Sequence, residues 1–152
     1  AQKFALIDME YILKQIPSYQ QANQQMESLS KQWQSQIEAK ANEAKKLYED
    51  YQKSANTLSA TQKTSKEEAI VAKEKEAAEL KKKYFSPEGE LYKKRESLIA
   101  PIQDEIYNAV KEISNTKGYS LILDRASDTG IIFASPRIDI SNEVLAKLGY
   151  SK

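Results

Sequence analysis

The sequence lacks two residue types on which much enzyme and metal chemistry depends. Its 152 residues include no histidine and no cysteine. Without histidine the chain lacks the commonest general base near neutral pH, and without cysteine it has no thiolate nucleophile. Zinc and haem sites also rely mainly on these two residues. The composition therefore argues against an enzyme, and we expect no catalytic residues, no cofactor and no bound metal ion.

Helix-breaking residues and long apolar runs are also scarce. The chain has four glycines and four prolines, 30% of its residues are charged, and 40% belong to the hydrophobic class. This composition favours long helices and leaves too few apolar residues for one large core. No apolar run approaches the roughly 20 residues of a membrane-spanning helix. The sequence therefore predicts no membrane-spanning segment.

Charge of either sign is nearly balanced along the chain. There are 23 basic and 22 acidic residues, and the two signs are interspersed. Residues 61–85 lean basic by two, with seven basic residues against five acidic ones. So small an excess is not the electrostatic footprint of a nucleic-acid-binding protein. We therefore expect no nucleic-acid partner.

The N-terminal residues predict a strand, a short helix and then a very long helix. Lys3–Ile7 is a strand-like run that ends at Asp8, which can cap a short helix over residues 9–16. Pro17 stops that helix, and a long stretch without glycine or proline follows. A helix over about residues 18–59 would be roughly 60 Å long, too long to remain inside a compact body.

Apolar residues in this stretch repeat at alternating steps of three and four, which is the spacing of a coiled-coil seam. Two consecutive steps of four after Trp33 form a stutter that should locally unwind the supercoil. A polar break at residues 59–65 precedes a capping box of Ser65 and Glu68, which predicts a second, antiparallel helix. The predicted seam of this hairpin comprises Tyr19, Met26, Leu29, Trp33, Ile37, Tyr48, Tyr51, Leu58, Ile70 and Leu80.

A third helix should follow the second after a short interruption. Ser86 and Pro87 fit the N-cap and first position of a helix that ends at Gly118. Pro101 lies inside it and should kink it. The bend is expected within one turn of this proline.

The C-terminal residues change from helical to strand-like patterns. Residues 119–124 and 131–134 are rich in β-forming side chains around a polar turn, and they predict a β-hairpin. Ser141 is expected to cap a last short helix that ends at Gly149. Asp124, Asp128 and Asp139 could suggest a metal site, but their spacing fits turns and strand ends instead. 

About three short strands per chain form a sheet too small to be stable alone, with two exposed edges. Pairing between copies would cover both edges and the apolar side chains, so we expect a symmetric oligomer. We assign its interface to Phe4, Leu6, Leu121, Leu123, Ile131 and Phe133.

These patterns together predict an α+β fold. A long antiparallel helical coiled-coil hairpin over residues 18–99 should project from a small β body. The strand-rich ends, residues 1–17 and 100–152, should form that body and the oligomer contacts.

Three stretches are similar to one known family over essentially the whole chain. They are the opening KFALIDMEYIL, the central YFSPEGELYKKRESLIAPIQDEIYNAVKEI and the ending GYSLILDRASDTGIIFASPRIDISNEVLAKLGY. The chain resembles the Skp (OmpH-like) family of periplasmic chaperones, and the Phe-x-Pro-Glu-Gly stretch resembles its Bacteroidetes-type members. The resemblance implies a homotrimer with a β-barrel body and three helical tentacles around a cavity. It also implies an ATP-independent holdase that prevents unfolded outer-membrane proteins from aggregating during transit.

Apolar residues away from the seam are candidate client contacts, namely Leu47, Val71 and Phe85. The near-neutral charge departs from the strongly basic character of well-known family members, so no lipopolysaccharide site is carried over. Lys63 and Lys66 at the tip are interpreted as a solvated end, with electrostatic contact to lipid or client as the alternative. Contact of the chain with membranes or lipopolysaccharide also stays open. 

A different class of function is also open. A structural coiled-coil spacer or adaptor of the cell envelope would share the long helices, but it would not need strands at both chain ends. The sequence opens at Ala1 without an initiator methionine or a signal peptide. A mature exported chain would begin in this way, and so would a trimmed piece of a longer chain. The expected periplasmic location is what the family resemblance implies.

Overall fold

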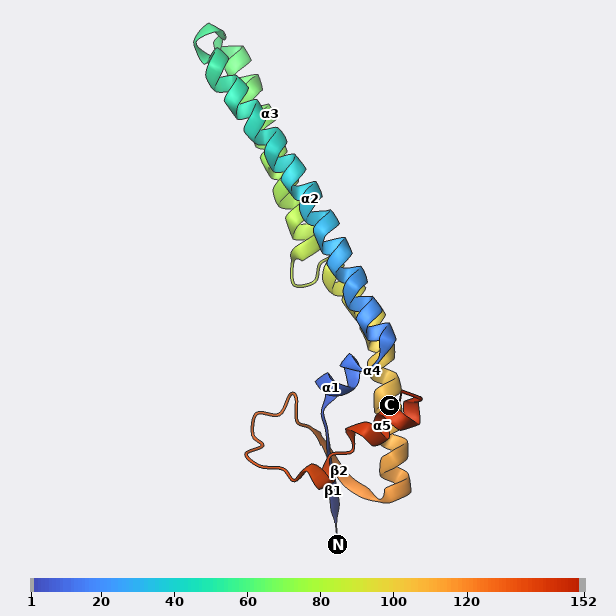
Figure 1. Ribbon diagram of the computed structural model, residues 1–152. Helices are drawn as coiled ribbons and strands as arrows, with labels where there is room; N and C mark the ends of the chain where they lie inside the picture. Colours follow the sequence, from blue (N-terminus) through green and yellow to red (C-terminus); the bar gives the residue numbers. More distant parts are fainter. Residues whose placement is uncertain (1, 151–152) are drawn as a thin grey trace. The chain divides into compact units, whose positions relative to one another are not determined.

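The computed structural model describes residues 2–150. It is mostly helical, with one short strand near each end of the chain (Figure 1). This confirms the predicted long helical hairpin and a small strand region, with two strands in place of the three expected. The elements in chain order are β1 (Lys3–Ile7), α1 (Met9–Lys14), α2 (Pro17–Ser54), the 3-10 helix η1 (Ala55–Thr57), α3 (Ala60–Phe85), α4 (Glu90–Lys117), β2 (Tyr119–Asp124), the 3-10 helix η2 (Pro136–Ile138) and α5 (Ser141–Leu148).

Packing divides the chain into two compact units. One unit, which we call the body unit, contains the residues up to Gln24 and those from Glu96 onward. The other, which we call the hairpin unit, is Gln25–Arg95. The boundaries fall inside α2 and α4, so each of these helices contributes residues to both units.

The sheet of the body unit joins the two ends of the sequence. Strands β1 and β2 pair in parallel, with Phe4 opposite Leu121 and Leu6 opposite Leu123. On the other side of β1, the backbone N–H of Ile140 donates to the carbonyl oxygen of Leu6 at 2.8 Å. Strand β1 is therefore bonded along both of its edges by C-terminal residues.

Helices α1, α4 and α5 supply most of the core of the body unit. In α4 the buried residues Ile102, Ile106, Ala109 and Ile113 follow steps of three and four, which places them on one face of the helix. They pack in one cluster with residues of β1, α1 and α5. Complete burial of such a side chain stabilises the fold by roughly 1.5–3 kcal/mol. 

The helix ends in the body unit follow the sequence signals closely. The Asp8 carboxylate accepts a hydrogen bond from the backbone N–H of Tyr11 at 3.0 Å, which confirms its role as N-cap of α1. Gly118 and Gly149 adopt the left-handed conformation, with φ of 76° and 88°, and end α4 and α5. The expected cap of α5 is wrong: the N-cap is Ile140, and the Ser141 N–H is bound by the Asp139 carboxylate at 2.9 Å. 

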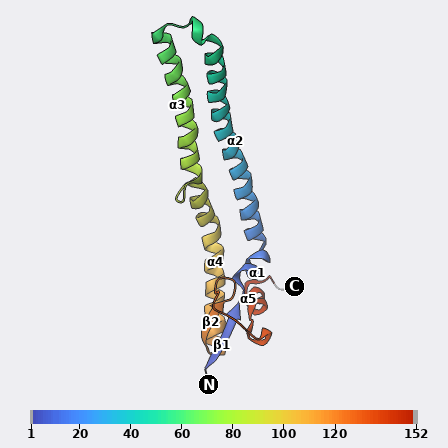
Figure 2. The same ribbon diagram turned by 90° about the vertical axis from the view of Figure 1, so that its left-hand side faces the viewer.

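The hairpin unit consists mainly of α2 and α3, which run side by side in both views (Figures 1 and 2). Within residues 25–95, all of which the structure describes, the buried hydrophobic residues are Met26, Ala44 and Ile70. Packing between the two helices therefore buries few large side chains. Among the described residues, no helix is both long enough and apolar enough to cross a membrane.

The start of α3 differs from the prediction. The capping box is formed by Ser59 and Gln62, with bonds of 2.9 and 3.1 Å, and not by Ser65 and Glu68. Both pairs match the same pattern. The earlier pair lies directly after the turn, so the helix begins there and continues past Ser65. Similarly, α4 begins at Glu90 after a turn, whereas Pro87 was the expected start. The helix then continues through Pro101.

The predicted second strand of the C-terminal hairpin is wrong for the single chain. In the described residues the sheet contains β1 and β2 alone, and residues 131–134 form no strand. The Asp124 carboxylate accepts hydrogen bonds from the Ala126 N–H and the Ser127 hydroxyl, each at 3.0 Å. These bonds turn the chain away from β2 directly after the strand. As a result, no edge in the single chain pairs with residues 131–134.

Candidate functional site: the strand ends of the body unit and the surface of the hairpin unit

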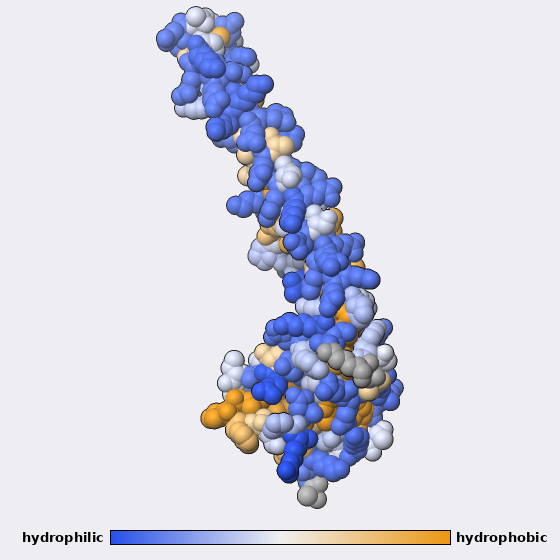
Figure 3. All heavy atoms as spheres, in the orientation of Figure 1, coloured by the Kyte–Doolittle hydropathy of each residue, from blue (hydrophilic) through white to orange (hydrophobic). Residues whose placement is uncertain are grey.

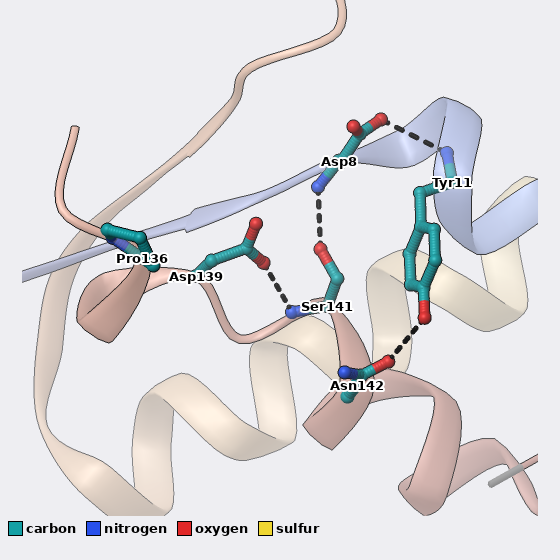
Figure 4. Close-up of a pocket in the computed structure, with 6 residues that line it drawn as sticks. All are labelled: Asp8, Tyr11, Pro136, Asp139, Ser141 and Asn142. Carbon is teal, nitrogen blue, oxygen red and sulfur yellow. Dashed lines mark hydrogen bonds between the residues drawn. The ribbon is translucent and has the colours of Figure 1, made fainter. Parts of the chain in front are cut away.

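A network of hydrogen bonds links the first helix to the last segment of the chain. The backbone N–H of Asp8 donates to the Ser141 hydroxyl at 2.8 Å, and the Tyr11 hydroxyl donates to the Asn142 side chain at 2.8 Å. Figure 4 shows these side chains facing one another across a pocket of about 330 Å³. The pocket is lined by Asp8, Tyr11, Pro136, Asp139, Ser141 and Asn142.

Asp124 makes a second link between the two ends. Its Oδ1 atom accepts a hydrogen bond from the backbone N–H of Met9, the first residue of α1, at 3.0 Å. The same carboxylate also accepts bonds from Ala126 and Ser127 in the turn that follows β2. One side chain therefore fixes both the start of α1 and the exit from β2.

The aspartates near this junction act as capping and turn residues. Asp128 accepts from the Gly130 N–H at 2.8 Å, and Asp139 accepts from the Ser141 N–H. Among residues 2–150, no cluster of three or more histidine, cysteine, aspartate or glutamate side chains could hold a metal ion. Because the polar groups around the pocket bind one another, we interpret it as a structural junction between the chain ends.

Large apolar side chains are exposed on the body unit. Phe4 and Leu121, which are paired across β1 and β2, are 51% and 47% exposed. Ile132 and Phe133, in the segment between β2 and η2, are 100% and 84% exposed. Figure 3 shows hydrophobic surface on the side of the body unit where this segment lies. Side chains of this size are rarely left in water in such numbers unless a partner covers them.

The other predicted interface residues lie deeper. Leu123 and Ile131 are half-buried, and Leu6 is buried within the chain, where it pairs with Leu123. Leu6 is therefore covered by its own chain, and the strands around it would separate it from another copy. The sheet ends at β2, whose outer edge has no strand beside it among residues 2–150. Leu121 lies on this edge strand, and Ile132 and Phe133 follow it in the segment before η2.

The predicted seam residues fall into four groups. Met26 and Ile70 are buried, and Tyr48 is 49% exposed. Tyr19 belongs to the body unit, where it packs against the core cluster. The half-buried members within the hairpin unit are Leu29, Trp33, Ile37, Tyr51, Leu58 and Leu80.

An aromatic cluster joins α2 to the last turn of α3. The rings of Trp33 and Tyr84 are stacked, with centroids 4.5 Å apart and planes 1° from parallel. Phe85 meets Trp33 edge-on at 6.4 Å, and the Tyr84 hydroxyl donates to the Gln36 side chain at 3.0 Å. The contact combines ring stacking with a hydrogen bond, and both bring α3 onto α2.

Four charged side chains join α2 and α3 farther along the hairpin. Lys73 lies 3.0 Å from Glu43 and 3.6 Å from Glu76, and Lys40 lies 3.3 Å from Glu76 and 3.9 Å from Glu43. The hydrogen bond from Lys73, with the nearby charge of Lys40, lowers the pKa of the Glu43 carboxyl. The bond to Glu43 also raises the pKa of the Lys73 ammonium group. We call these four residues the ion quartet.

Near the tip, a polar contact joins α2 and α3. The Tyr51 hydroxyl donates to the Glu67 carboxylate at 2.7 Å, and this bond raises the pKa of the Tyr51 phenol. Val71, one of the candidate client contacts, is 59% exposed on α3. The other two candidates, Leu47 and Phe85, are half-buried. 

A groove of about 340 Å³ lies between α2 and α3, next to the ion quartet. It is lined by small and polar side chains and by Tyr48, which is half exposed. The lining residues are Ala41, Ala44, Lys45, Tyr48, Glu74 and Ala77. Alanines in the seam thus leave a hollow where larger residues would close the contact.

Sequence reasoning did not find the stacked pair or the ion quartet. Trp33 was placed on the seam, but its partner Tyr84 lies 51 positions later, and the pairing depends on where the tip turns. A signal was available for the quartet, because Lys40 and Glu43 precede a matching Lys73 and Glu76 at the same spacing. Recognising it requires the register of the two helices, which the misplaced start of α3 obscured.

Comparisons with known proteins agree along nearly the whole chain. The family model described as "Outer membrane protein (OmpH-like)" matches residues 3–148. The chain is 22% identical over 150 residues to the chaperone protein Skp of Pectobacterium atrosepticum, covering 97% of this chain and 86% of that protein. 

A solved structure shares the fold. It is the crystal structure of a candidate outer membrane chaperone (OmpH-like) from Caulobacter crescentus, with a TM-score of 0.76 and 11% sequence identity. The match covers 97% of this chain and 84% of that one. At this level of identity the likeness concerns the fold alone.

Proposed function

Because this chain belongs to the OmpH-like family, whose members are chaperones and not enzymes, we propose that it is an ATP-independent holdase of the periplasm. It would bind unfolded outer-membrane proteins and prevent their aggregation on the way to the outer membrane. The observation that carries this proposal is the hairpin unit, a long pair of helices with few buried apolar residues and a polar surface. 

The physical demands on a holdase agree with this surface. Ordering an unfolded client costs conformational entropy, so binding through many weak and reversible contacts is favoured over one deep pocket. Exposed or half-buried apolar groups such as Leu47, Val71 and Phe85 are spread over the hairpin among charged residues. They would offer scattered contacts to a mobile chain. Enclosure would also keep client strands from pairing with one another.

We further propose that the working form is a homotrimer built through the strand ends of the body unit. Its support is the free outer edge of β2 together with the exposed Leu121, Ile132 and Phe133. Residues 131–134 would form a strand against the β2 edge of another copy. Pairing of this kind gives each segment the partner that its own chain does not supply, and repetition around an axis closes a small barrel.

Shortening the hairpin tests the holdase proposal. A variant that joins about residue 45 to about residue 77 through a short turn removes the distal hairpin and leaves every strand residue in place. We expect it to assemble like the natural chain, and to lose most suppression of aggregation of an unfolded barrel protein, measured by light scattering. 

If the shortened chain protects the client as well as the natural one, the hairpin is not the client-binding element. It would then act as a spacer, as expected for a structural coiled-coil protein of the cell envelope. Sedimentation of the same sample ensures that lost protection is not confused with lost assembly.

A further inference from the structure

The segment between β2 and η2, residues 125–135, is the longest stretch of the described chain outside its helices and strands. Figure 1 shows it as an open loop of the body unit. Its beginning is held by the Asp124 carboxylate, which accepts hydrogen bonds from Ala126 and Ser127, each at 3.0 Å. These bonds shape the turn directly after β2, and they do not extend to residues 131–134.

Residues 131–134 expose both their backbone and their largest side chains. Within residues 2–150, none of their N–H and C=O groups is hydrogen-bonded. Ile132 is 100% exposed and Phe133 is 84% exposed. In the single chain, this stretch therefore combines an unpaired backbone with apolar side chains that extend into solvent.

An endoprotease recognises its substrate in this form. The substrate enters the active site as an extended strand whose backbone groups bond to the enzyme, while a side chain beside the cleaved bond fills a pocket. Exposed loops are accordingly the preferred positions of proteolytic nicking. Phe133 offers a large apolar side chain for such a pocket, and the small Ala134 follows it. No helix or strand has to open before the enzyme can bind.

Other aromatic side chains are exposed as well, but their backbones are bonded. Tyr92 and Tyr107, on α4, are 48% and 51% exposed, and Phe4 of β1 is 51% exposed. Helix α4 would have to unwind locally, or β1 would have to leave the sheet, before either fitted an active site as an extended strand. The unpaired backbone around Phe133, and not the exposure of its ring, distinguishes this position from the other three.

We propose that residues 131–134 are a proteolytic cleavage site through which unassembled copies of the chain are removed. The partner is an endoprotease that binds an extended strand and accepts a large apolar residue before the cleaved bond. Hydrolysis breaks the C–N bond between Phe133 and Ala134. One water molecule supplies the hydroxyl group of the new carboxyl group on Phe133 and a hydrogen of the new amine on Ala134.

Assembly controls access to this site. The inference rests on the proposed homotrimer, in which residues 131–134 pair with β2 of another copy. That pairing bonds the backbone and covers the apolar side chains, so the protease and the neighbouring copy compete for the same residues. Cleavage also divides the pairing strand itself. It separates Ile140 and Val144, which are buried in the core cluster, from the rest of the chain. A cut copy is therefore excluded from assembly and loses covalent support for its core.

Chymotrypsin, which cleaves after aromatic residues, is the probe for a first experiment on the full chain. Leu121→Asp supplies the unassembled form, and mass spectrometry identifies the fragments. We expect its first cut after Phe133, giving residues 1–133 and 134–152, at least about tenfold faster than in the assembled natural chain. Tyr92 and Tyr107 are internal controls and should stay uncut at that stage.

A double variant, Leu121→Asp with Phe133→Ser, is the matched control. It should lose full-length chain at least about tenfold more slowly than Leu121→Asp, because the remaining aromatic residues lie in bonded backbone. Two results would overturn the proposal. One is a folded Leu121→Asp chain that is cut first at another residue. The other is cleavage after Phe133 that is equally fast in the assembled natural chain and in Leu121→Asp.

A dilution series of the natural chain keeps the test independent of Leu121→Asp, should that variant fail to fold. The rate of cleavage after Phe133 should rise in proportion to the fraction of unassembled chain, measured by sedimentation at each concentration. If the chain stays assembled throughout, it should stay uncut. Rapid cleavage of an assembled chain would refute protection by assembly and leave the homotrimer standing. A natural chain that sediments as a monomer throughout would instead refute the homotrimer, and with it the control of cleavage by assembly.

Discussion

At the scale of single residues, the body unit depends on side chains that bind backbone groups far away in the sequence. Asp124 is the clearest case, because it follows β2 and yet accepts a hydrogen bond from the N–H of Met9 at the start of α1. Ser141 does the same in the opposite direction, since its hydroxyl accepts from the N–H of Asp8. A parallel pair of strands from opposite ends of a chain needs such links, because no short connection keeps its strands together.

Replacing Asp124 tests this view. In Asp124→Ala the Met9 N–H loses its partner in a partly buried position, and the turn residues Ala126 and Ser127 lose theirs. We expect the free energy of unfolding to fall by about 1–3 kcal/mol in urea denaturation followed by circular dichroism. Asp124→Asn keeps an acceptor oxygen and should lose less than half as much.

Asp128→Ala is the control for that experiment. Asp128 lies in the same loop and accepts one bond, from the Gly130 N–H at an exposed site. Its removal should change stability by under about 0.5 kcal/mol. Equal losses in the two alanine variants would mean that the loop, and not the link to α1, is what Asp124 stabilises.

At the scale of elements, local signals in the sequence predicted the helices and several of their ends. The cap at Asp8 and the ends at Gly118 and Gly149 depend on neighbouring residues only, and all three are confirmed. Residues 131–134 were predicted as a strand from composition, but a strand also requires a partner edge. The predicted start of α3 was wrong because two serine residues each match the capping-box pattern. Local sequence patterns cannot predict a helix start that depends on where a turn lies, or a strand that depends on a partner edge.

The candidate site was less predictable than the fold for the same reason. Leu121 and Phe133 were assigned to an interface from the need to cover strand edges, and both are exposed in the single chain. That assignment stays a prediction. The Trp33–Tyr84 contact joins residues of two different helices, and it depends on the register set at the tip. The register between two helices is set only when they pack together, so it cannot be predicted from the sequence pattern of either helix alone.

The ion quartet should make the middle of the hairpin unit sensitive to salt. We expect Lys73→Gln to speed amide exchange in residues 60–76 by about two- to fivefold at low salt, and by much less in 1 M salt, where exposed charges are screened. Lys75→Gln is the matched control, because the ion pair of Lys75 within residues 2–150 is with Glu79 of its own helix, at 4.0 Å. Exchange that is equally fast in both variants would contradict a role for the quartet.

The pH dependence of the quartet follows from its two shifted groups. The pKa of Glu43 is lowered by the bond from Lys73, so its contribution is present above the ordinary glutamate pKa and is lost as pH falls through the lowered value. The pKa of Lys73 is raised, so its contribution is complete below the ordinary lysine pKa and is lost as pH rises through the raised value. Between about pH 5 and pH 9 the effect of Lys73→Gln on exchange should therefore stay constant, once intrinsic exchange rates are corrected for pH.

At the scale of the whole molecule, the two compact units differ in their cores and in the surfaces that they expose to solvent. The body unit has a packed core around Ile12, Ile106 and Val144, yet it leaves a free strand edge and large apolar side chains in water. The hairpin unit has little core and a polar surface. The first pattern calls for another copy of the chain, and the second suits transient contact with many partners.

The last prediction concerns assembly through the strand ends. Leu121 is half exposed on β2, beside the free edge that would receive residues 131–134 of another copy. In Leu121→Asp an unpaired carboxylate would have to enter an apolar contact, which costs far more than an exposed substitution. We expect the natural chain to sediment at about three times the mass of one chain at micromolar concentration, and the variant to sediment as a folded monomer.

Tyr107→Asp is the control, since Tyr107 is an equally exposed aromatic residue of the body unit on α4, outside the proposed interface. It should assemble normally. A stable monomer of the natural chain would refute assembly itself, and loss of assembly in both variants would show that any added charge on the body unit suffices. Only a difference between the two variants places the contact at β2, and the same preparations then show whether client protection requires assembly.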